Sequence, residues 1–339
     1  MARGLGYYIL VRALMIIPTI LILYTIVFIL LRLLPGDPIL AVVGTRHIPP
    51  EQLEHLRRIA GLDKPPYIQY FEYLWNVFHG DFGVTLAIPM GKPVKDYIFT
   101  RFPATLELTI FSFIVSVCLG LLTGTIAAIK RGTAMDTGMR LYSIIAYTLF
   151  IPWFGLMLQY FFGLILGILP TSGRLDPGIK VESITGLYVL DSILTGNSRA
   201  LASALAHLVL PSITLGIVLS GAYTRLVRNN LVDILSMDFI RSYHARGISR
   251  GKIVWYALKN AFIPVITLMG LQFAILLGGA ILTETTFSWP GMGTFIVDRI
   301  DYRDYNSIQG AIIFFAFFVS IISLIVDIIY ALLDPRVKY

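Results

Sequence analysis

Polar side chains interrupt otherwise apolar segments of this chain at a few positions, and they are the first candidates for chemistry. A charged side chain at the centre of a bilayer costs about 2.5–3.5 kcal/mol on insertion scales, so polar groups that are retained there tend to be functional. The candidates are Glu107, Gln159, His207, Gln272, Glu284 and Asp327. For each of them, the structural alternative is an interhelical hydrogen bond or a position at the membrane surface.

A second group of candidate residues is cationic. The stretch from Arg225 to Pro264 separates two long uncharged segments, and residues 228–263 contain six Lys/Arg and two Asp. Its patterning is helical, which indicates an ordered surface that contacts a partner and is mechanically coupled to it. A mobile basic loop attracted to anionic lipid is the alternative, and the helix caps in the stretch argue against it.

Two short helices with a glycine corner are predicted within this stretch. The first runs from Asp238 to Arg246 and ends at Gly247, because glycine accepts the left-handed backbone found after a helix C-terminus. Ser249 is the expected N-cap of the second helix, and Pro264 is expected to begin the next membrane span. One face of the second helix is apolar at helical spacing, and it comprises Ile253, Val254, Ala257, Leu258 and Ala261.

No catalytic motif accompanies these residues. The chain lacks the GxxxxGK[ST] phosphate loop; the nearest approach, residues 247–253, has the wrong spacing and no Ser or Thr after Lys252. The five histidines are scattered and the single cysteine, Cys118, cannot form an internal disulfide. We therefore expect no metal site and no cofactor in this chain, and a protein that is not itself an enzyme.

The composition and the spacing of charged residues predict the helices that position the candidate residues. Of 339 residues, 56% are hydrophobic and 14% are charged, against about 25% charged in soluble domains. Six uncharged runs each have at least 19 residues, enough to cross a hydrocarbon core of about 30 Å. They are 13–31, 108–129, 141–173, 200–224, 260–283 and 305–326. Too little polar chain remains to cover six such runs in water, so we predict an all-α polytopic membrane protein with six transmembrane helices.

Lysine and arginine in the short loops orient these spans, since cytoplasmic loops are enriched in both. The asymmetry predicts that both termini are cytoplasmic, with residues 36–100 outside and 228–262 inside the cell membrane. The first run is followed by Arg32 and lacks the small-residue cleavage site of a signal peptide. It is therefore predicted to be an uncleaved membrane span. The predicted parts are an N-terminal span (1–35), an extracytoplasmic insert (36–106) and a five-helix core (107–335).

The insert is predicted to be partly helical. Gly61 ends one helical segment, and Asp63 is the expected cap of the next, with Pro65 and Pro66 in its first turn. This second helix carries an apolar stripe of Tyr70, Phe71, Leu74, Trp75 and Phe78. Core packing is the default for the stripe, and its partner could be the first span, the membrane surface or another subunit.

Two of the spans carry small-residue motifs that allow helices to approach closely. They are Gly120-x-x-x-Gly124 in the second span and Gly163-x-x-x-Gly167 in the third. Cys118 is likewise expected to pack as a small residue. The third uncharged run is 33 residues long and contains Pro152, which predicts a kink, a tilt or a re-entrant bend.

An ordered set of short stretches runs along nearly the whole chain and is specific when taken together. It includes LLPGDP (33–38), GLDKP (61–65), HGDFG (79–83), RFPATLEL (101–108), TSGR (171–174), AHLVLPSITLG (206–216), DFIRSYHARGISRGKI (238–253), GGAILTETTFSWPGMG (278–293) and DPR (334–336). With this set the chain resembles the permease subunit of a dipeptide/oligopeptide ABC importer, the first permease of the pair, with the fold of type I importer permeases.

The resemblance implies an assembly in which this chain forms half of a translocation pathway. A second homologous permease would complete the pore, and an extracytoplasmic solute-binding protein would deliver peptide. Two ATPase subunits, which bind ATP and Mg, would dock on the coupling loop 228–262. The residues expected to couple to them are Arg241, Ser242, Tyr243, Ala245, Arg246, Gly247, Ile248 and Ser249. Gln159, Gln272 and Glu284 are expected to line the path.

One departure from the family pattern lies in the coupling loop. Where such importers have Glu-Ala-Ala, this chain has Arg241, Ser242 and Tyr243, and the interval from Gly247 to Pro264 is longer. The difference leaves open which side chains contact the ATPase, and it does not change where the ATPase docks.

Three alternative functions stay open at this point. The same permease class could import another solute, such as a nickel complex or an oligosaccharide. An ion-driven secondary transporter would favour paired acids at mid-membrane and broken helices in repeated halves. A structural or assembly membrane protein could use the insert and the basic loop as docking surfaces.

Overall fold

The computed structural model describes residues 5–33, 39, 49–59, 61–87 and 91–333. Four of its helices are long and apolar enough to cross a membrane, and two pairs of helices, each bent at a short break, bring the number of spans to six if each pair crosses once. The four long helices are α1 (Leu5–Leu33), α5 (Val94–Ile129), α9 (Ser198–Leu235) and α14 (Tyr305–Leu333). The predicted all-α polytopic fold is confirmed.

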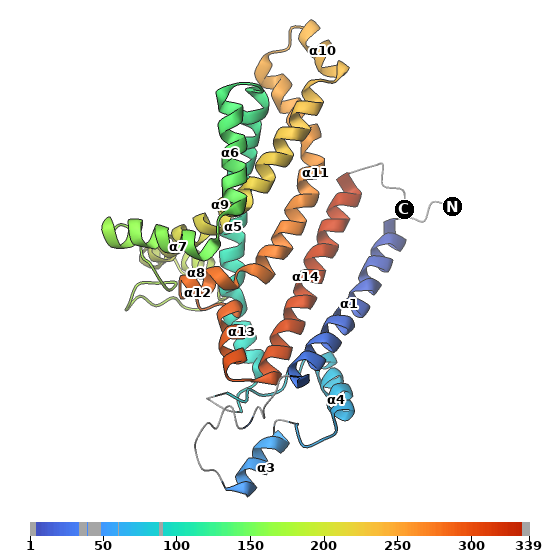
Figure 1. Cartoon of the computed structure of the whole chain (residues 1–339), viewed down its shortest axis with the longest axis vertical. Helices are drawn as coiled ribbons and strands as arrows, with labels where there is room; N and C mark the ends of the chain where they lie inside the picture. The colour runs from blue at the N-terminus through green and yellow to red at the C-terminus, as the bar shows by residue number, and fades with distance from the viewer. Residues whose placement is uncertain (1–4, 34–38, 40–48, 60, 88–90, 334–339) are drawn as a thin grey trace.

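The third span is sharply bent, as its length and proline predicted. It consists of α6 (Ala134–Thr148), α7 (Ile151–Leu158) and a π-helical segment, η1 (Gln159–Ile165). The two halves meet at an angle of 104°, and α7 projects sideways from the bundle (Figure 1). Pro152 lies in the first turn of α7, where its missing N–H costs no helical hydrogen bond.

The fifth span differs from the prediction. Pro264 does not begin a helix; it lies inside α11 (Arg250–Gly279), whose two halves, 250–262 and 264–278, are inclined by 54°. A proline within a helix removes one backbone hydrogen bond and bends the helix without having to end it. The predicted second short helix of the basic stretch is therefore the first half of α11.

The bundle is built around α5 and α9, which lie side by side along most of their lengths. Around this pair, α6 packs on α9, α11 contacts both α9 and α14, and α1 packs on α14 (Figure 1). A Cβ at Gly120 would lie 2.2 Å from the Cβ of Tyr223 on α9, so the absence of a side chain permits this close approach. Packing is confirmed for Gly120 and Gly124.

Two other packing predictions are wrong. Gly163 in η1 faces Thr171 in the loop that follows and not a neighbouring helix, and a Cβ at Gly167 would meet open space. Cys118 is exposed on the outside of α5. The spacing of small residues gives no information about which helix face is turned inward, and here the inward face of α5 contains Gly120 and Gly124 but not Cys118.

The insert contains α3 (Pro50–Ile59) and α4 (Pro66–Phe78). The N-cap of α4 is Pro65, without a side-chain hydrogen bond, so the predicted cap at Asp63 is wrong. Tyr70 and Leu74 pack against Tyr24 and Phe28 of α1, which makes the first span one partner of the apolar stripe. The rest of the stripe, Phe71, Trp75 and Phe78, is exposed.

Buried Asp304 anchors the end of the insert. Its Oδ2 accepts hydrogen bonds from the hydroxyls of Thr85 (2.5 Å) and Ser307 (2.7 Å) and from the backbone N–H of Ala87 (3.3 Å). α5 begins at Val94, so the predicted insert boundary at residue 106 falls within a helix. The first third of α5 was missed because it carries charges and lies outside the uncharged run.

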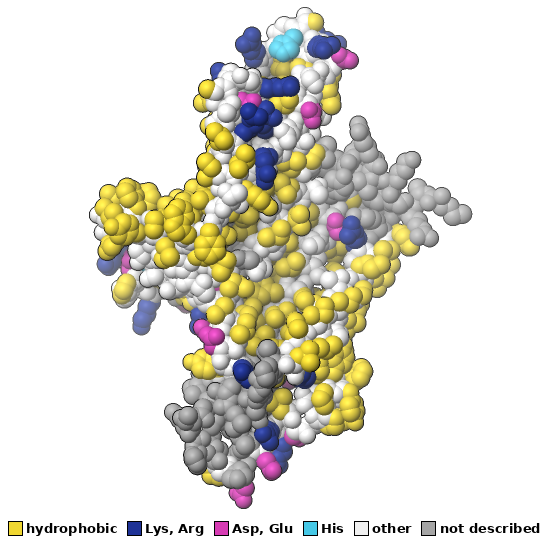
Figure 2. Space-filling model, viewed as in Figure 1, with side chains coloured by type: hydrophobic (Ala, Val, Ile, Leu, Met, Phe, Trp, Pro, Cys, Tyr) yellow, Lys and Arg dark blue, Asp and Glu magenta, His cyan; other side chains and the backbone are white. Residues whose placement is uncertain are grey.

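The two ends of the bundle differ in charge. Lys and Arg gather at the end that carries α10 (Asp238–Ala245), whereas hydrophobic side chains cover α7 and much of the lower bundle (Figure 2). Arg12 and Asp327 form an ion pair of 3.3 Å, which joins the beginning of α1 to the end of α14. Those two helix ends point toward the same half of the molecule as α10 (Figure 1).

Candidate functional site

The corner predicted from the sequence is a compact helix–turn–helix, and its cytoplasmic location stays a prediction. α10 follows α9 after a short turn, and Gly247 adopts a φ of +72° between α10 and α11. The N–H of Ile248 donates to the carbonyl of Tyr243 (3.1 Å), and the N–H of Gly247 donates to the carbonyl of His244 (3.0 Å). These two bonds are those of a Schellman motif, which requires a left-handed residue at the glycine position.

An apolar cluster fixes the corner to the bundle. Ile240 of α10 is 2% exposed and packs with Ile253 and Ala257 of α11 and with Leu231 of α9. The expected apolar face of the second helix is thereby confirmed for Ile253, Ala257, Leu258 and Ala261, whereas Val254 is not part of the cluster. Ser249 occupies the N-cap position of α11 as predicted, although its side chain makes no capping hydrogen bond.

The remaining residues of the corner divide into two sets. Tyr243 and Ile248 are partly buried and pack against the apolar cluster, so they stabilise the corner from within. The exposed set consists of Arg241, Ser242, Ala245, Arg246, Gly247 and Ser249. Arg241 pairs with Asp238 at 3.2 Å, but both side chains are more than three-quarters exposed, so this pair contributes little to stability. The free face of the corner is basic and accessible.

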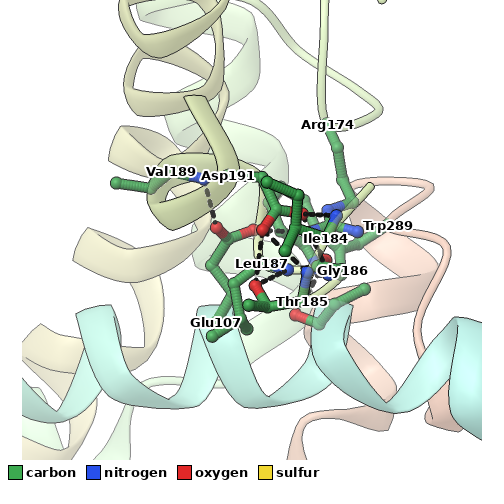
Figure 3. Close-up of polar contacts among 10 residues, drawn as sticks. Glu107, Arg174, Ile184, Thr185, Gly186, Leu187, Val189, Asp191 and Trp289 are labelled. Carbon is green, nitrogen blue, oxygen red and sulfur yellow. Dashed lines mark hydrogen bonds and ion pairs between the residues drawn. The ribbon is translucent and has the colours of Figure 1, made fainter. Parts of the chain in front are cut away.

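A buried polar cluster lies at the other side of the bundle, where a loop and α8 (Tyr188–Leu194) cover α5 (Figure 3). Arg174 from the loop donates to the Oε2 of Glu107 (2.5 Å) and to the carbonyl of Gly186 (3.1 Å). The Oε1 of Glu107 accepts the backbone N–H of Val189 (2.7 Å). The Arg174 guanidinium also lies 3.6 Å from the ring centre of Tyr188. Both charged side chains are at most 5% exposed.

Asp191 organises the same loop from the side of α8. Its carboxylate accepts the backbone N–H groups of Thr185 (2.9 Å) and Gly186 (2.9 Å) and the hydroxyl of Thr185 (2.6 Å). Burial alone would raise the pKa of Asp191, but the hydrogen bonds from Thr185, Gly186 and Ile184 outweigh it and hold the pKa below its ordinary value. Glu107 is paired with Arg174, and Asp191 is held by hydrogen bonds from neutral groups, so the cluster positions a loop.

Two of the three predicted path residues meet at α12 (Ile281–Thr286). Glu284 is fully buried; its carboxylate accepts the hydroxyl of Thr105 (2.5 Å) and the backbone N–H of Thr294 (3.0 Å). The amide of Gln159 donates to the carbonyls of Thr171 (2.7 Å) and Thr286 (3.0 Å). In this conformation both side chains connect elements of the chain itself.

Gln272 lies elsewhere, buried on α11 at 7% exposure. Within the described part of the chain no hydrogen bond joins it to Gln159 or Glu284. His207, a further candidate, is buried and bonded to the carbonyl of Ser203 (2.8 Å) one turn earlier in α9. The assignment of Gln159, Gln272 and Glu284 to a solute path stays a prediction.

Sequence reasoning missed the ion pair and the role of Asp191. Glu107 stood out as a carboxylate near an apolar run, but Arg174 was only one basic residue of an outside loop. The two are 67 residues apart, and no local pattern relates them. The signal that could have predicted the pair is Glu107 itself, because a buried carboxylate requires a cation as its partner.

Together, the long apolar helices, the basic corner and the buried polar cluster define a multi-pass all-α membrane protein. The fold is similar to a chain of a solved structure described as inward facing conformations of the MetNI methionine ABC transporter. The TM-score is 0.52 at 15% identity, over 71% of this chain and 98% of that one. At this identity the likeness concerns the fold alone.

Family models match most of the chain. The model described as "Binding-protein-dependent transport system inner membrane component" matches residues 120–339, and the model of the N-terminal part of such membrane components matches residues 5–109. The chain belongs to the family of binding-protein-dependent transport system inner membrane components, and it is a transport permease subunit of the inner membrane.

Similar proteins align over nearly the full length. The di/tripeptide transport system permease protein DppB of Pseudomonas aeruginosa is 40% identical over 96% of both chains. The dipeptide transport system permease protein DppB of Escherichia coli K12 is 35% identical over 98% of both. The glutathione transport system permease protein GsiC of Salmonella choleraesuis is 37% identical over 98% of this chain and 99% of its own.

Proposed function

We propose that this chain forms half of the translocation pathway of an ATP-driven importer of dipeptides or oligopeptides. The peptide class is supported by the permeases similar to it, two of which are named for di- or tripeptides. The observation that carries the mechanism is the corner, in which α10 is held by Ile240 while a basic face stays accessible. A rigid element of this kind can transmit the movement of a docked partner into the bundle.

The partners follow from this function. A second homologous permease completes the pathway, two ATPase subunits that hold ATP and Mg dock on the loop 228–262, and an extracytoplasmic binding protein delivers the peptide. ATP favours one packing of the spans only through contacts that differ between the two states. The movement is a rigid-body switch between discrete arrangements, for which a corner held by an apolar cluster is suited.

Uptake by the reconstituted complex tests the function. Vesicles that contain both permeases and both ATPases should accumulate a labelled dipeptide only when the binding protein is present outside and ATP is present inside. Accumulation of a nickel complex or an oligosaccharide in place of peptide would show that the importer carries that solute and not peptides. Uptake that needs an ion gradient and no ATP would instead identify a secondary transporter.

Nucleotide binding provides a second prediction. The purified single chain should neither bind nor hydrolyse ATP, since it has no phosphate loop, whereas the assembled complex should do both. Equilibrium binding of a fluorescent ATP analogue measures this directly. Saturable binding of the ATP analogue by the single chain would contradict the assignment of nucleotide binding to the ATPase subunits alone.

Membrane orientation gives a third prediction. With Cys118 replaced by serine, a cysteine at Ser249 should react with a membrane-impermeant maleimide only after the cells are opened. A cysteine at Asp63, which is exposed in the insert, should react in intact cells and serves as the matched control. Labelling of the Ser249 cysteine from outside would show that both the termini and the corner have been assigned to the wrong side.

A further inference from the structure

A second feature of the cytoplasmic half is an apolar groove on the surface of the bundle. It lies between α5 and the first half of α11, has a volume of about 540 Å³, and its walls are formed chiefly by Leu121, Leu122, Ile126, Leu258 and Phe262. This volume falls within the roughly 300–1,000 Å³ of small-molecule sites. Leu122 is 61% exposed, so the groove opens to the surroundings of the helices.

The rim of the groove is cationic and aromatic. Lys259 is exposed, and its Nζ lies 5.5 Å from the ring centre of Trp255, which is 59% exposed. Among the residues that the structure describes, no carboxylate lies within ion-pair distance of Lys259. The site thus combines an apolar wall with one cation that no side chain neutralises.

The position of the groove indicates its depth in the membrane. Its α5 wall lies near the inner end of the uncharged run 108–129, and Lys259 is the last charge before the uncharged run 260–283. Tryptophan and lysine at the end of an apolar run are typical of the membrane–water interface. The orientation in the proposed function makes this the cytoplasmic interface, where anionic lipids are concentrated.

We propose that this groove binds one anionic phospholipid of the cytoplasmic leaflet. The acyl chain lies against Leu122, Ile126 and Phe262, and the headgroup phosphate pairs with Lys259 beside Trp255. Charge complementarity favours this occupant over a zwitterionic lipid, because Lys259 is the charged residue among those that line the groove. The proposal rests on the proposed function for the choice of leaflet. The bound lipid would brace the half of α11 that begins at the Gly247 corner.

Tryptophan fluorescence tests the proposal, because Trp255 is a built-in reporter. The full-length chain in mixed micelles is titrated with brominated phosphatidylglycerol or brominated phosphatidylcholine. Phosphatidylglycerol should quench a component of the emission at lower concentration, and Trp255→Phe should remove that component. Lys259→Ala should weaken the apparent affinity for phosphatidylglycerol about fivefold, whereas Lys252→Ala, an exposed lysine of the same helix, should leave it unchanged.

Three results would overturn the proposal. Equal quenching by the two lipids would remove the anionic preference, and a preference that survives Lys259→Ala would place the lipid elsewhere. Quenching that is present in the single chain but lost in the assembled complex would show that another subunit covers the groove. Because ATP and peptide do not enter this assay, a failure of the uptake experiment would not be mistaken for a failure of lipid binding.

Discussion

Gly247→Val is expected to reduce ATPase docking and solute uptake by about tenfold or more while the chain still inserts into the membrane. The φ of Gly247 is +72°, and a Cβ built there meets no atom within 4 Å, so the effect comes from the backbone alone. A β-branched residue in the left-handed region costs about 1–3 kcal/mol. Relief of this strain breaks the bond from the N–H of Ile248 to the carbonyl of Tyr243 and turns α10 away from its position.

The matched control for this prediction is Gly251→Val. Gly251 lies four residues further on, in the first turn of α11, and also has open space around it, but its φ is not in the left-handed region. The same side chain should therefore be tolerated there. Co-purified ATPase and peptide uptake are measured for both variants. Normal docking and uptake in Gly247→Val, or an equal loss in Gly251→Val, would show that the corner is not the coupling element.

A substitution in the bundle provides the contrasting pattern. Gln272→Ala on α11 should lower peptide uptake while leaving ATPase attachment intact, because Gln272 lies in the second half of α11, beyond the bend and away from the corner. Gln272 is preferred to Glu284 for this purpose, since the carboxylate of Glu284 is bonded to Thr105 and Thr294 and its loss would also disturb the fold. Loss of docking in Gln272→Ala would contradict the separation of the two roles.

The buried ion pair should give the largest change in stability. Removing one partner of such a pair leaves an uncompensated charge and costs about 3–5 kcal/mol. Arg174→Met and Glu107→Leu should each lower the apparent melting temperature of the purified chain by several degrees. Each should also expose the loop between η1 and α8 to protease, because Glu107 holds that loop through Arg174 and the N–H of Val189.

The double variant distinguishes a charge effect from simple loss of packing. When both charges are replaced by apolar side chains, no unpaired charge remains buried, so Arg174→Met/Glu107→Leu should be more stable than either single variant. Lys64→Ala is the matched control, since the ion pair of Lys64 with Glu72 has side chains that are 42% and 45% exposed and should hardly change the melting temperature. Additive losses in the double variant would exclude the buried pair as the source of the effect.

The sequence by itself determined the class of protein and the local shape of the corner. Only helices and closed β-barrels satisfy every backbone polar group inside a membrane, and uninterrupted apolar runs of about 20 residues have the length of a spanning helix and not of a strand. The turn at Gly247 was predictable for a local reason as well, since a helix often ends with a left-handed residue, and glycine adopts that backbone most readily. Pro152 likewise indicated the bend of the third span. Each of these features depends on residues that are close in the sequence.

The tertiary structure alone decided the features that depend on distant residues. It pairs Arg174 with Glu107 and brings Gln159 to α12, the helix that contains Glu284. It also turns Tyr243 and Ile248 inward, while Arg241 and Arg246 remain exposed. It also kept α11 continuous through Pro264, because packing against α9 and α14 stabilises the helix on both sides of the proline. The packing of helices that are remote in sequence decides which helix face is buried and which partner a buried charge meets. The spacing of residues along the chain does not contain this information.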